Sequence, residues 1–227
     1  MVYNNITLLK NKNPNLDKLL DGTITTVSDS ELGNIQSIGK YAFCWCTSLT
    51  SITLPNSVTR IEERAFSGCT SLTSIIIPDS VTTIGEAAFH QCYELSSVTL
   101  SNNITEIPGW MFNYCYKLTS ITIPEGVTKI GMAAFGGCKN LTTVVVPSTI
   151  TNMGRSTFMD CTKLTSVTVL ATTPPSVWSA QSTNPTFENT PIISGNGYIY
   201  VPASSVDAYK RATGWSSYAS KIRAIPE

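Results

Sequence analysis

The chain has few charged residues, and their signs cancel. Lys plus Arg and Asp plus Glu number 15 each, and charged residues make up 13% of the 227 residues. This share is about half of what is usual in soluble domains. A net charge of zero gives no attraction for phosphate backbones, so nucleic acid is not an expected partner. Thr, Ser and Asn must therefore carry much of the hydration of the surface.

Other absences narrow the class of protein further. No apolar run approaches the roughly 20 residues that span a bilayer, and the start, MVYNNITLLKNKNPN, shows no secretory signal peptide. His90 is the only histidine, and the spacing of Cys44 and Cys46 is not a standard zinc spacing. No glycine-rich phosphate loop is visible. We therefore expect no membrane span, no metal, no cofactor and no enzymatic activity.

What the sequence does contain is a unit of 23 residues that recurs six times without insertion or deletion. A phenylalanine, a cysteine and a leucine return at this step. The three columns are Phe43, Phe66, Phe89, Phe112, Phe135 and Phe158; Cys46, Cys69, Cys92, Cys115, Cys138 and Cys161; and Leu49, Leu72, Leu95, Leu118, Leu141 and Leu164. A short fixed period indicates a solenoid, in which one repeat buries its apolar side only when a neighbour stacks on it.

Within one unit the spacing predicts two kinds of local structure. Ala42, Phe43 and Cys46 fall at i, i+1 and i+4, which favours a single helical turn facing the interior. The alternation that ends in Ile52 and Leu54 predicts a short strand with both side chains inside. A second extended piece then leads into the next coil.

The consensus of the unit, I-G-x-x-A-F-x-x-C-x-x-L-x-x-I-x-I-P-x-x-V, is specific enough to resemble a known family. One copy contains Ile84-Gly85, Ala88-Phe89, Cys92, Leu95, Val98 and Leu100. It is similar to the BspA-like leucine-rich repeats of the Treponema pallidum type. The resemblance implies a repeat solenoid of the α+β class, a leucine-rich-repeat-like right-handed rod of short strands and single helical turns with N- and C-terminal caps.

We expect an N-terminal cap over residues 1–34, six repeats over 35–170, and a degenerate repeat with a helical C-terminal cap over 171–227. Residues 13–20 suggest a short helix, and 23–27 should pair with the first full coil. Residues 199–202 repeat the strand pattern with Phe187 upstream, which predicts a seventh coil with an insertion. Residues 204–207 resemble a capping box that opens a helix. The apolar contacts of this cap are expected to be Trp215, Tyr218 and Ile222.

The cysteines are better explained by packing than by chemistry. Six of the seven occupy one interior column, where a free cysteine behaves as a small hydrophobe. Parallel Cβ directions in neighbouring coils are poor geometry for a disulfide. We therefore expect a reduced, buried ladder, with Cys44 alone more exposed.

Two surfaces are candidates for binding, and the first is aromatic. Its residues are Tyr41, Trp45, His90, Tyr93, Trp110, Tyr114 and Tyr116. Tyr41 with Trp45, and Trp110 with Tyr114, are spaced i, i+4 on the outer side of the expected helical turns. Other coils hold small or polar residues in these columns, so the fold does not require aromatic rings there. Exposed Trp and Tyr clusters are typical of binding hot spots, and rings packed on each other or on a cap are the alternative explanation.

The second candidate surface is the outward side of the strands. It comprises Ser51, Thr53, Ser74, Ile76, Ser97, Thr99, Ser120, Thr122, Thr143, Val145, Ser166 and Thr168. Hydroxyl and β-branched residues simply suit an exposed strand. The alternative is a flat recognition surface for sugars or protein strands.

The resemblance also implies a function. Proteins of this family are mostly bacterial surface proteins implicated in adhesion to host matrix proteins and in contact between bacteria. We therefore expect a non-enzymatic binding or adhesion scaffold, extracellular or at the cell surface, that recognises a host or microbial protein or a glycan. The alternative is a structural component of a larger assembly such as a phage or prophage particle. The identity of the ligand and the oligomeric state are left open.

Overall fold

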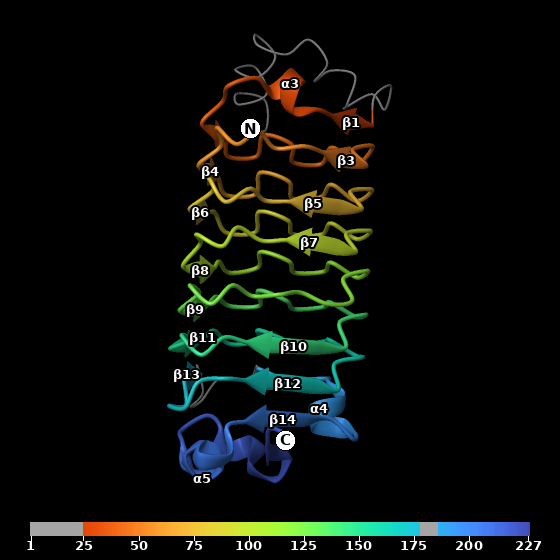
Figure 1. Ribbon diagram of the computed structural model, residues 1–227. Coiled ribbons are helices and arrows are strands. Elements are labelled where there is room, and N and C mark those ends of the chain that lie inside the picture. Colours follow the sequence, from red (N-terminus) through yellow and green to blue (C-terminus); the bar gives the residue numbers. More distant parts are fainter. Residues whose placement is uncertain (1–24, 178–185) are drawn as a thin grey trace.

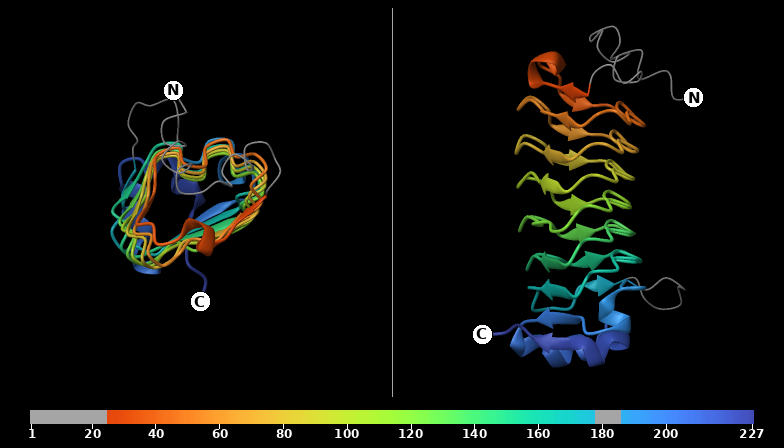
Figure 2. Two further views of the ribbon diagram at one scale, coloured as in Figure 1. Left: turned by 90° about the horizontal axis from the view of Figure 1, so that it is seen from above. Right: turned by 90° about the vertical axis from the view of Figure 1, so that its right-hand side faces the viewer.

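The computed structural model describes residues 25–177 and 186–227, which form a rod of stacked coils (Figure 1). Seen along the axis, successive coils lie over one another, and the C-terminal helices close one end (Figure 2). The predicted repeat solenoid is confirmed, with many short parallel strands and few helices. None of the helices in the described ranges is long and apolar enough to cross a bilayer.

One face of the rod carries the first strand of each coil. These strands are β1 (Thr26–Val27), β3 (Ser51–Ile52), β5 (Ser74–Ile76), β7 (Ser97–Thr99), β10 (Thr143–Val146), β12 (Ser166–Val169), β14 (Tyr198–Val201) and β15 (Ile222–Ala224). They pair in parallel as β1-β3, β5-β7 and β10-β12-β14-β15. The register joins equivalent positions of neighbouring coils, as Ser74 with Ser97 and Thr143 with Ser166 show. Thr122 continues this face through a single bridge to Val145.

A second face carries the shorter strands that lead into the next coil. They are β2 (Ser37–Ile38), β4 (Arg60–Ile61), β6 (Thr83–Ile84), β8 (Glu106–Ile107), β9 (Lys129–Ile130), β11 (Asn152–Met153) and β13 (Ser176–Val177). These strands form the parallel sheets β2-β4-β6 and β8-β9-β11-β13. The inner residue of each strand is buried, so both faces enclose one continuous core.

Between the two faces the backbone forms turns, and the prediction of a single helical turn is wrong. In the first coil Tyr41 and Trp45 have φ values of 59° and 62°, which an α-helix does not allow. The reason is the stacking of the coils. The N–H groups of Tyr41, Phe43 and Trp45 all donate to carbonyls of the next coil, at 3.1, 2.7 and 2.8 Å. The intervening N–H groups of Ala42 and Cys44 close local turns instead.

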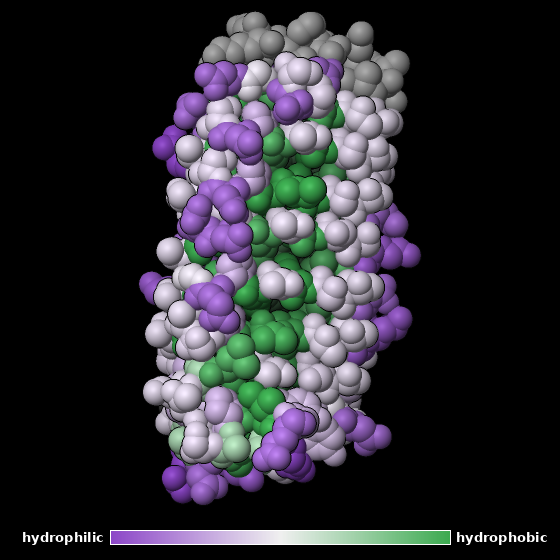
Figure 3. Space-filling view, in the orientation of Figure 1, coloured by the Kyte–Doolittle hydropathy of each residue, from purple (hydrophilic) through white to green (hydrophobic). Residues whose placement is uncertain are grey.

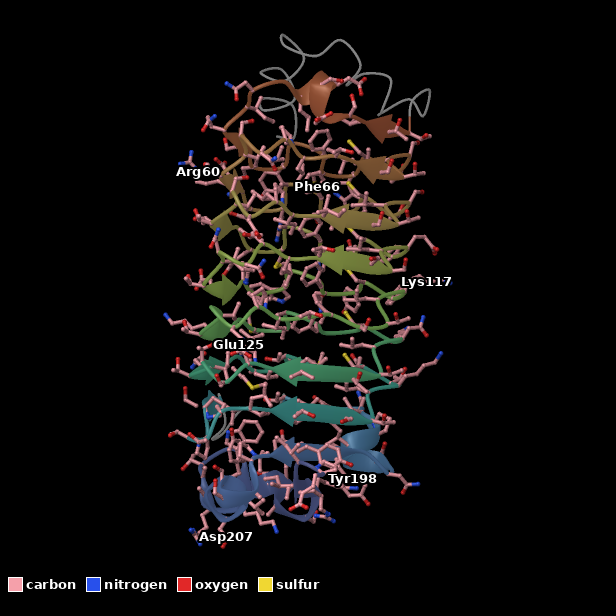
Figure 4. All side chains as sticks on the ribbon, viewed as in Figure 1. Arg60, Phe66, Lys117, Glu125, Tyr198 and Asp207 are labelled. Atoms are coloured by element: carbon pink, nitrogen blue, oxygen red, sulfur yellow. The ribbon has the colours of Figure 1, made fainter. Side chains whose placement is uncertain are left out.

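The phenylalanine column forms the centre of the core. Rings of neighbouring coils stack with centroids 5.2 to 5.7 Å apart and nearly parallel planes. Figure 4 shows Phe66 inside the rod, while Arg60 and Lys117 project from opposite sides. Burying one such side chain stabilises the fold by about 1.5 to 3 kcal/mol, and each ring is covered only when both neighbouring coils are in place.

The cysteine column is buried and unpaired among the described residues, and its thiols make a second ladder. The Sγ atoms of Cys69, Cys92, Cys115, Cys138 and Cys161 lie 3.0 to 3.3 Å from a phenylalanine carbonyl of the preceding coil. Each of these carbonyls also accepts the N–H of the cysteine in its own coil, so both lone pairs are used. Cys44 is only 6% exposed, and the expectation of an exposed Cys44 is wrong because the tight turn folds it inward.

Threonine and serine hydroxyls tie the coils together at the surface. The side chains of Thr50, Thr73, Ser96, Thr142 and Thr165 donate to a carbonyl of the coil before. A similar ladder joins Thr128 to Thr105 and Thr151 to Thr128. Part of the high Thr and Ser content is therefore structural, because these hydroxyls add a second hydrogen bond to carbonyls that already accept a backbone N–H from the same residue.

Near the N-terminal end, β1 pairs with β3, as predicted for the segment ending at Val27. The next element, α3 (Asp29–Leu32), begins with a capping box in which Ser28 and Glu31 bond to each other's backbone. The predicted helix at 13–20 lies outside the described residues.

The C-terminal end follows the prediction of a seventh coil. Phe187 stacks on Phe158 with ring centroids 5.7 Å apart, and β14 pairs with β12. The cap that follows comprises α4 (Pro191–Ser194), η1 (Ala203–Ser205), α5 (Val206–Arg211) and η2 (Ser216–Lys221). The capping box predicted at 204–207 is wrong, because the 3₁₀ turn η1 leads directly into α5 and the Ser205 side chain caps nothing.

The predicted apolar contacts of the C-terminal cap are confirmed. Trp215 and Ile222 are fully buried, and the Tyr218 ring meets the edge of Phe187 at 5.1 Å. The Trp215 indole N–H donates to the Pro175 carbonyl at 2.7 Å, and the Tyr209 hydroxyl donates to the Ala171 carbonyl at 2.8 Å. The cap therefore covers the last ring and also satisfies carbonyls of the last coil.

Candidate functional site

A depression of about 290 Å³ lies on the turn side of three successive coils. Its lining residues are Glu63, Arg64, Glu86, Ala87, His90, Trp110 and Asn113. They come from equivalent stretches that follow β4, β6 and β8, so stacking alone brings them together. Two of them, His90 and Trp110, belong to the predicted aromatic patch.

The backbone of this depression is left-handed at one position in every coil. Arg64, Ala87 and Trp110 have φ values of 54°, 56° and 55°. For any residue with a Cβ atom, alanine included, this conformation costs about 1 to 2 kcal/mol. The fold imposes the conformation, but it does not impose the tryptophan, because neighbouring coils have Ala87 and Ala133 in this column.

The charges around the depression are largely balanced. The Lys40 ammonium lies 2.6 Å from the Glu63 carboxylate, and this bond holds the pKa of Glu63 below its ordinary value. The Tyr41 hydroxyl also donates to Glu63, at 3.3 Å. Arg64 contributes a guanidinium and Glu86 a carboxylate to the same lining.

His90 is half-buried between the depression and a row of tyrosines. Burial lowers the pKa of His90, and the positive charge of Arg64 lowers it further, so the imidazole is neutral at pH 7. Its Nδ1 atom is buried and finds no hydrogen-bond partner within the described part of the chain.

The tyrosines continue from His90 as a row of ring contacts. The centroids of His90 and Tyr114 are 5.8 Å apart, those of Tyr114 and Tyr116 are 6.0 Å apart, and Tyr116 stacks on Tyr93 at 4.9 Å. The Lys139 ammonium lies 4.7 Å from the centre of the Tyr116 ring. We call His90, Tyr93, Tyr114 and Tyr116 the aromatic strip. The strip and Trp110 account for five of the seven predicted patch residues.

The remaining two residues lie apart from the strip. Tyr41 borders the depression through Glu63, which accepts its hydroxyl, and through Arg64, whose guanidinium lies 6.0 Å from its ring. Trp45 is 53% exposed in the same coil. A Cβ atom on Gly68 would lie 2.5 Å from the Trp45 ring, so this ring covers a glycine of the next coil. Tyr114 lies equally close to Gly137. The predicted helical i, i+4 pairs are wrong, because both members of each pair occupy left-handed positions of a turn.

The strand face has the predicted outward orientation. Ile76 and Val145 are 69% and 50% exposed, while the residues beside them in each strand are buried. A second depression of about 290 Å³ lies between β3 and β5, where the sheet is interrupted. Figure 3 shows an apolar strip running down this view of the rod with more polar side chains on both sides.

Sequence reasoning missed two parts of these surfaces. Tyr198 and Tyr200 continue the strand face beyond Ser166 and Thr168, and the Arg223 guanidinium lies 4.9 Å from the Tyr198 ring (Figure 4). The strand pattern of 199–202 contained the signal for them. The charged lining residues were also missed, although equivalent sequence positions relative to the phenylalanine of each coil could have placed them together. The lining residues missed were Glu63, Arg64, Glu86, Ala87 and Asn113.

The in-register coils, the phenylalanine stack and the outward strand residues define a leucine-rich-repeat solenoid. Residues 36–165 match the BspA type leucine rich repeat region in six copies. The chain therefore belongs to the family of proteins with BspA-type leucine-rich repeats. Repeats of this family indicate a protein-binding scaffold and are generally non-enzymatic.

Solved structures agree with this assignment. The leucine-rich repeat protein of T. pallidum is 28% identical, with a TM-score of 0.51 over 63% of this chain and 64% of that one. A leucine-rich repeat protein from Eubacterium ventriosum has a TM-score of 0.62 at 21% identity, over 74% of this chain and 43% of that one. One from Bacteroides ovatus has a TM-score of 0.51 at 23% identity, over 81% and 56%.

The chain spans less than two thirds of the length of each of these three structures. The two with identities below 25% are evidence for the fold alone. A comparison with curated proteins gave no significant match.

Proposed function

We propose that this chain is a non-catalytic recognition scaffold of a bacterial surface, which binds a protein or a glycan through the aromatic strip and the adjoining depression. The observation that carries the proposal is the identity of the residues at the left-handed positions. Trp110 and Tyr114 have φ values of 55° and 63°, whereas the next coil places Ala133 and Gly137 there. Tyr114 carries a left-handed backbone cost that Gly137 avoids, and the Trp110 ring stands where the fold accepts the methyl group of Ala133. The fold requires neither ring, which favours a role in binding.

The rigidity of the surface supports the same role. The strip residues are fixed by ring contacts to one another, and His90, Tyr93 and Tyr114 each have a backbone hydrogen bond to one neighbouring coil. A preformed surface loses little conformational entropy when it binds. Tyr and Trp also present large apolar areas with few rotatable bonds, which is why they dominate binding hot spots.

The test is a binding screen of immobilised extracellular matrix proteins and glycans, with variants taken from the neighbouring coils. Tyr93→Thr with Tyr116→Thr introduces the residue found at Thr70 and Thr162 in the same column, so the coils should still stack. Ile76→Thr with Val145→Thr makes the corresponding change on the strand face, where Thr53 and Thr99 are the equivalents. Both double variants should melt close to the parent chain.

We expect a saturable ligand whose binding is lost in the tyrosine variant and kept in the strand-face variant. The reverse pattern would move the site to the strand face. The absence of any ligand for the parent chain would contradict the proposal and favour a structural part of a larger assembly.

A further inference from the structure

We infer that the depression beside His90 and Trp110 is a subsite for one neutral sugar residue of a glycan. The inference deepens the proposed function and rests on it. It assigns the depression a ligand class, whereas the aromatic strip alone fits many protein and glycan ligands.

The size of the depression suits a single sugar ring. Sites for drug-sized ligands occupy about 300 to 1,000 Å³, and this depression, at about 290 Å³, lies at the lower limit. Trp110 and the small, buried Ala87 both line the depression. An indole against the apolar face of a pyranose ring is a favourable apolar contact, and the small alanine leaves room for the ring.

The charges of Lys40 and the lining residues sum to zero, so the depression has no net attraction for an ion of either sign. Lys40 neutralises Glu63 at 2.6 Å, which leaves the Glu86 carboxylate and the Arg64 guanidinium in the lining. A cationic side chain would meet Arg64, whose field already lowers the pKa of His90. An anionic sugar would meet Glu86. A neutral polyol avoids both repulsions.

The hydrogen-bonding groups also favour hydroxyls. Glu86 only accepts and Arg64 only donates hydrogen bonds. A sugar hydroxyl donates and accepts, so it can pair with both groups.

The path out of the depression fits a longer chain. His90 lines the depression and also contacts Tyr114, the first ring of the row that continues to Tyr116 and Tyr93. Further sugar residues would extend from the first one over the tyrosine rings. A free monosaccharide should therefore bind weakly, and an oligosaccharide should bind more tightly.

The experiment is an NMR titration of the intact chain with methyl glycosides of neutral hexoses and N-acetylhexosamines, with N-acetylneuraminic acid and arginine amide as charged probes. We expect at least one neutral glycoside to saturate, with the shifts centred on the Trp110 indole N–H and on the His90 ring. Trp110→Ala and His90→Asn take their new residues from Ala133 and Asn113 of the same columns. Each should weaken binding at least about tenfold, while Val145→Thr on the strand face should leave it unchanged.

Three results would overturn the inference. In the first, arginine amide or N-acetylneuraminic acid saturates the chain but no neutral glycoside does. In the second, none of the probes saturates it. In the third, the Trp110→Ala variant binds a neutral glycoside as tightly as the parent chain. If a ligand from the screen still needed Tyr93 and Tyr116 while no glycoside bound, the subsite would be wrong and the scaffold role would stand. If the screen found no ligand but a neutral glycoside saturated at Trp110, the subsite would stand by itself.

Discussion

The columns of equivalent residues inside and outside this rod differ in how strictly the fold determines their side chains. All seven phenylalanines of the chain lie in one interior column, and each is at most 1% exposed. Two residues further along each coil, an exterior column contains Trp45, Gly68, Gln91, Tyr114, Gly137 and Asp160 at positive φ. Stacking dictates the side chain inside, whereas outside it dictates only the backbone conformation. A large residue outside is therefore informative about function in a way that a phenylalanine inside is not.

The first way to sharpen this contrast is alkaline pH, which acts on buried groups, above all on the cysteines of the interior. Burial raises the pKa of the column thiols, to about 12 for Cys46 and Cys161. Unfolded thiols ionise near pH 8.5. The stability should therefore be constant below about pH 8.5 and fall above it by about 1.4 kcal/mol per pH unit for each thiol, until the folded pKa is reached.

The measurement is the free energy of unfolding in urea at about pH 7.5 and about pH 10.5. Summed over the column, the loss should exceed that of any single substitution. A Cys115→Ala, Cys138→Ala variant removes two of the titrating thiols and should show a shallower dependence on pH. An equal stability at the two pH values would contradict the buried thiol column.

A single ring removed from the interior should give the next largest effect. Phe89→Ala in the middle of the stack should cost about 3 to 5 kcal/mol, because rings on both sides lose a partner and the coils cannot collapse into the space. Tyr93→Thr in the same coil is the exterior control and should cost much less. Chemical denaturation of both variants checks this, and similar losses for the two would contradict the contrast.

The thiol ladder allows a finer comparison within one column. Cys115 donates to the Phe89 carbonyl at 3.3 Å, while Cys46 has no preceding phenylalanine among the described residues. Cys115→Ala should therefore cost about 0.5 to 1.5 kcal/mol more than Cys46→Ala, the net value of a typical hydrogen bond. The measurement is the free energy of unfolding in urea. A loss for Cys46→Ala equal to or larger than that for Cys115→Ala would contradict the thiol hydrogen bonds.

The smallest effect should come from the exterior. Trp45→Gly relieves the strain at a φ of 62° but uncovers Gly68, so the two terms oppose and stability should change by less than about 1 kcal/mol. Gly68→Ala places a Cβ 2.5 Å from the Trp45 ring and should destabilise by about 1 to 3 kcal/mol. The double variant should recover part of this loss, and strict additivity in a double-mutant cycle would refute the contact.

The fold could be predicted almost completely from the sequence, because a fixed step forces equal positions into contact. The stacked Phe rings of the six repeats and the inward strand residues follow from counting. The seventh coil does not, because Phe187 lies more than one 23-residue step after Phe158, and the strand pattern of residues 199–202 indicated it instead. The turn between the two faces could not be predicted by the same rule. The spacing of Phe43 and Cys46 in this turn is compatible with a helix. The backbone hydrogen bonds to the next coil, which the sequence does not reveal, exclude a helix.

The candidate site was harder to predict because it depends on contacts between columns. The sequence placed Tyr93 beside Tyr116, since both lie in one column of adjacent coils. It also grouped His90 with these rings, but it did not indicate that Tyr114 connects His90 to the pair, nor that Trp45 stands apart. Those relations depend on the directions of side chains at left-handed positions, which the repeat period does not determine.

The equal length of the coils makes the rod divisible. Loss or duplication of one block of 23 residues between Phe43 and Phe158 would join two coils whose columns still coincide, and neither end of the molecule would be altered. Such a change in a gene is an ordinary recombination between similar stretches. Descendants of this protein can therefore differ in length by whole coils, and each added coil brings a fresh set of exterior positions on which selection can act.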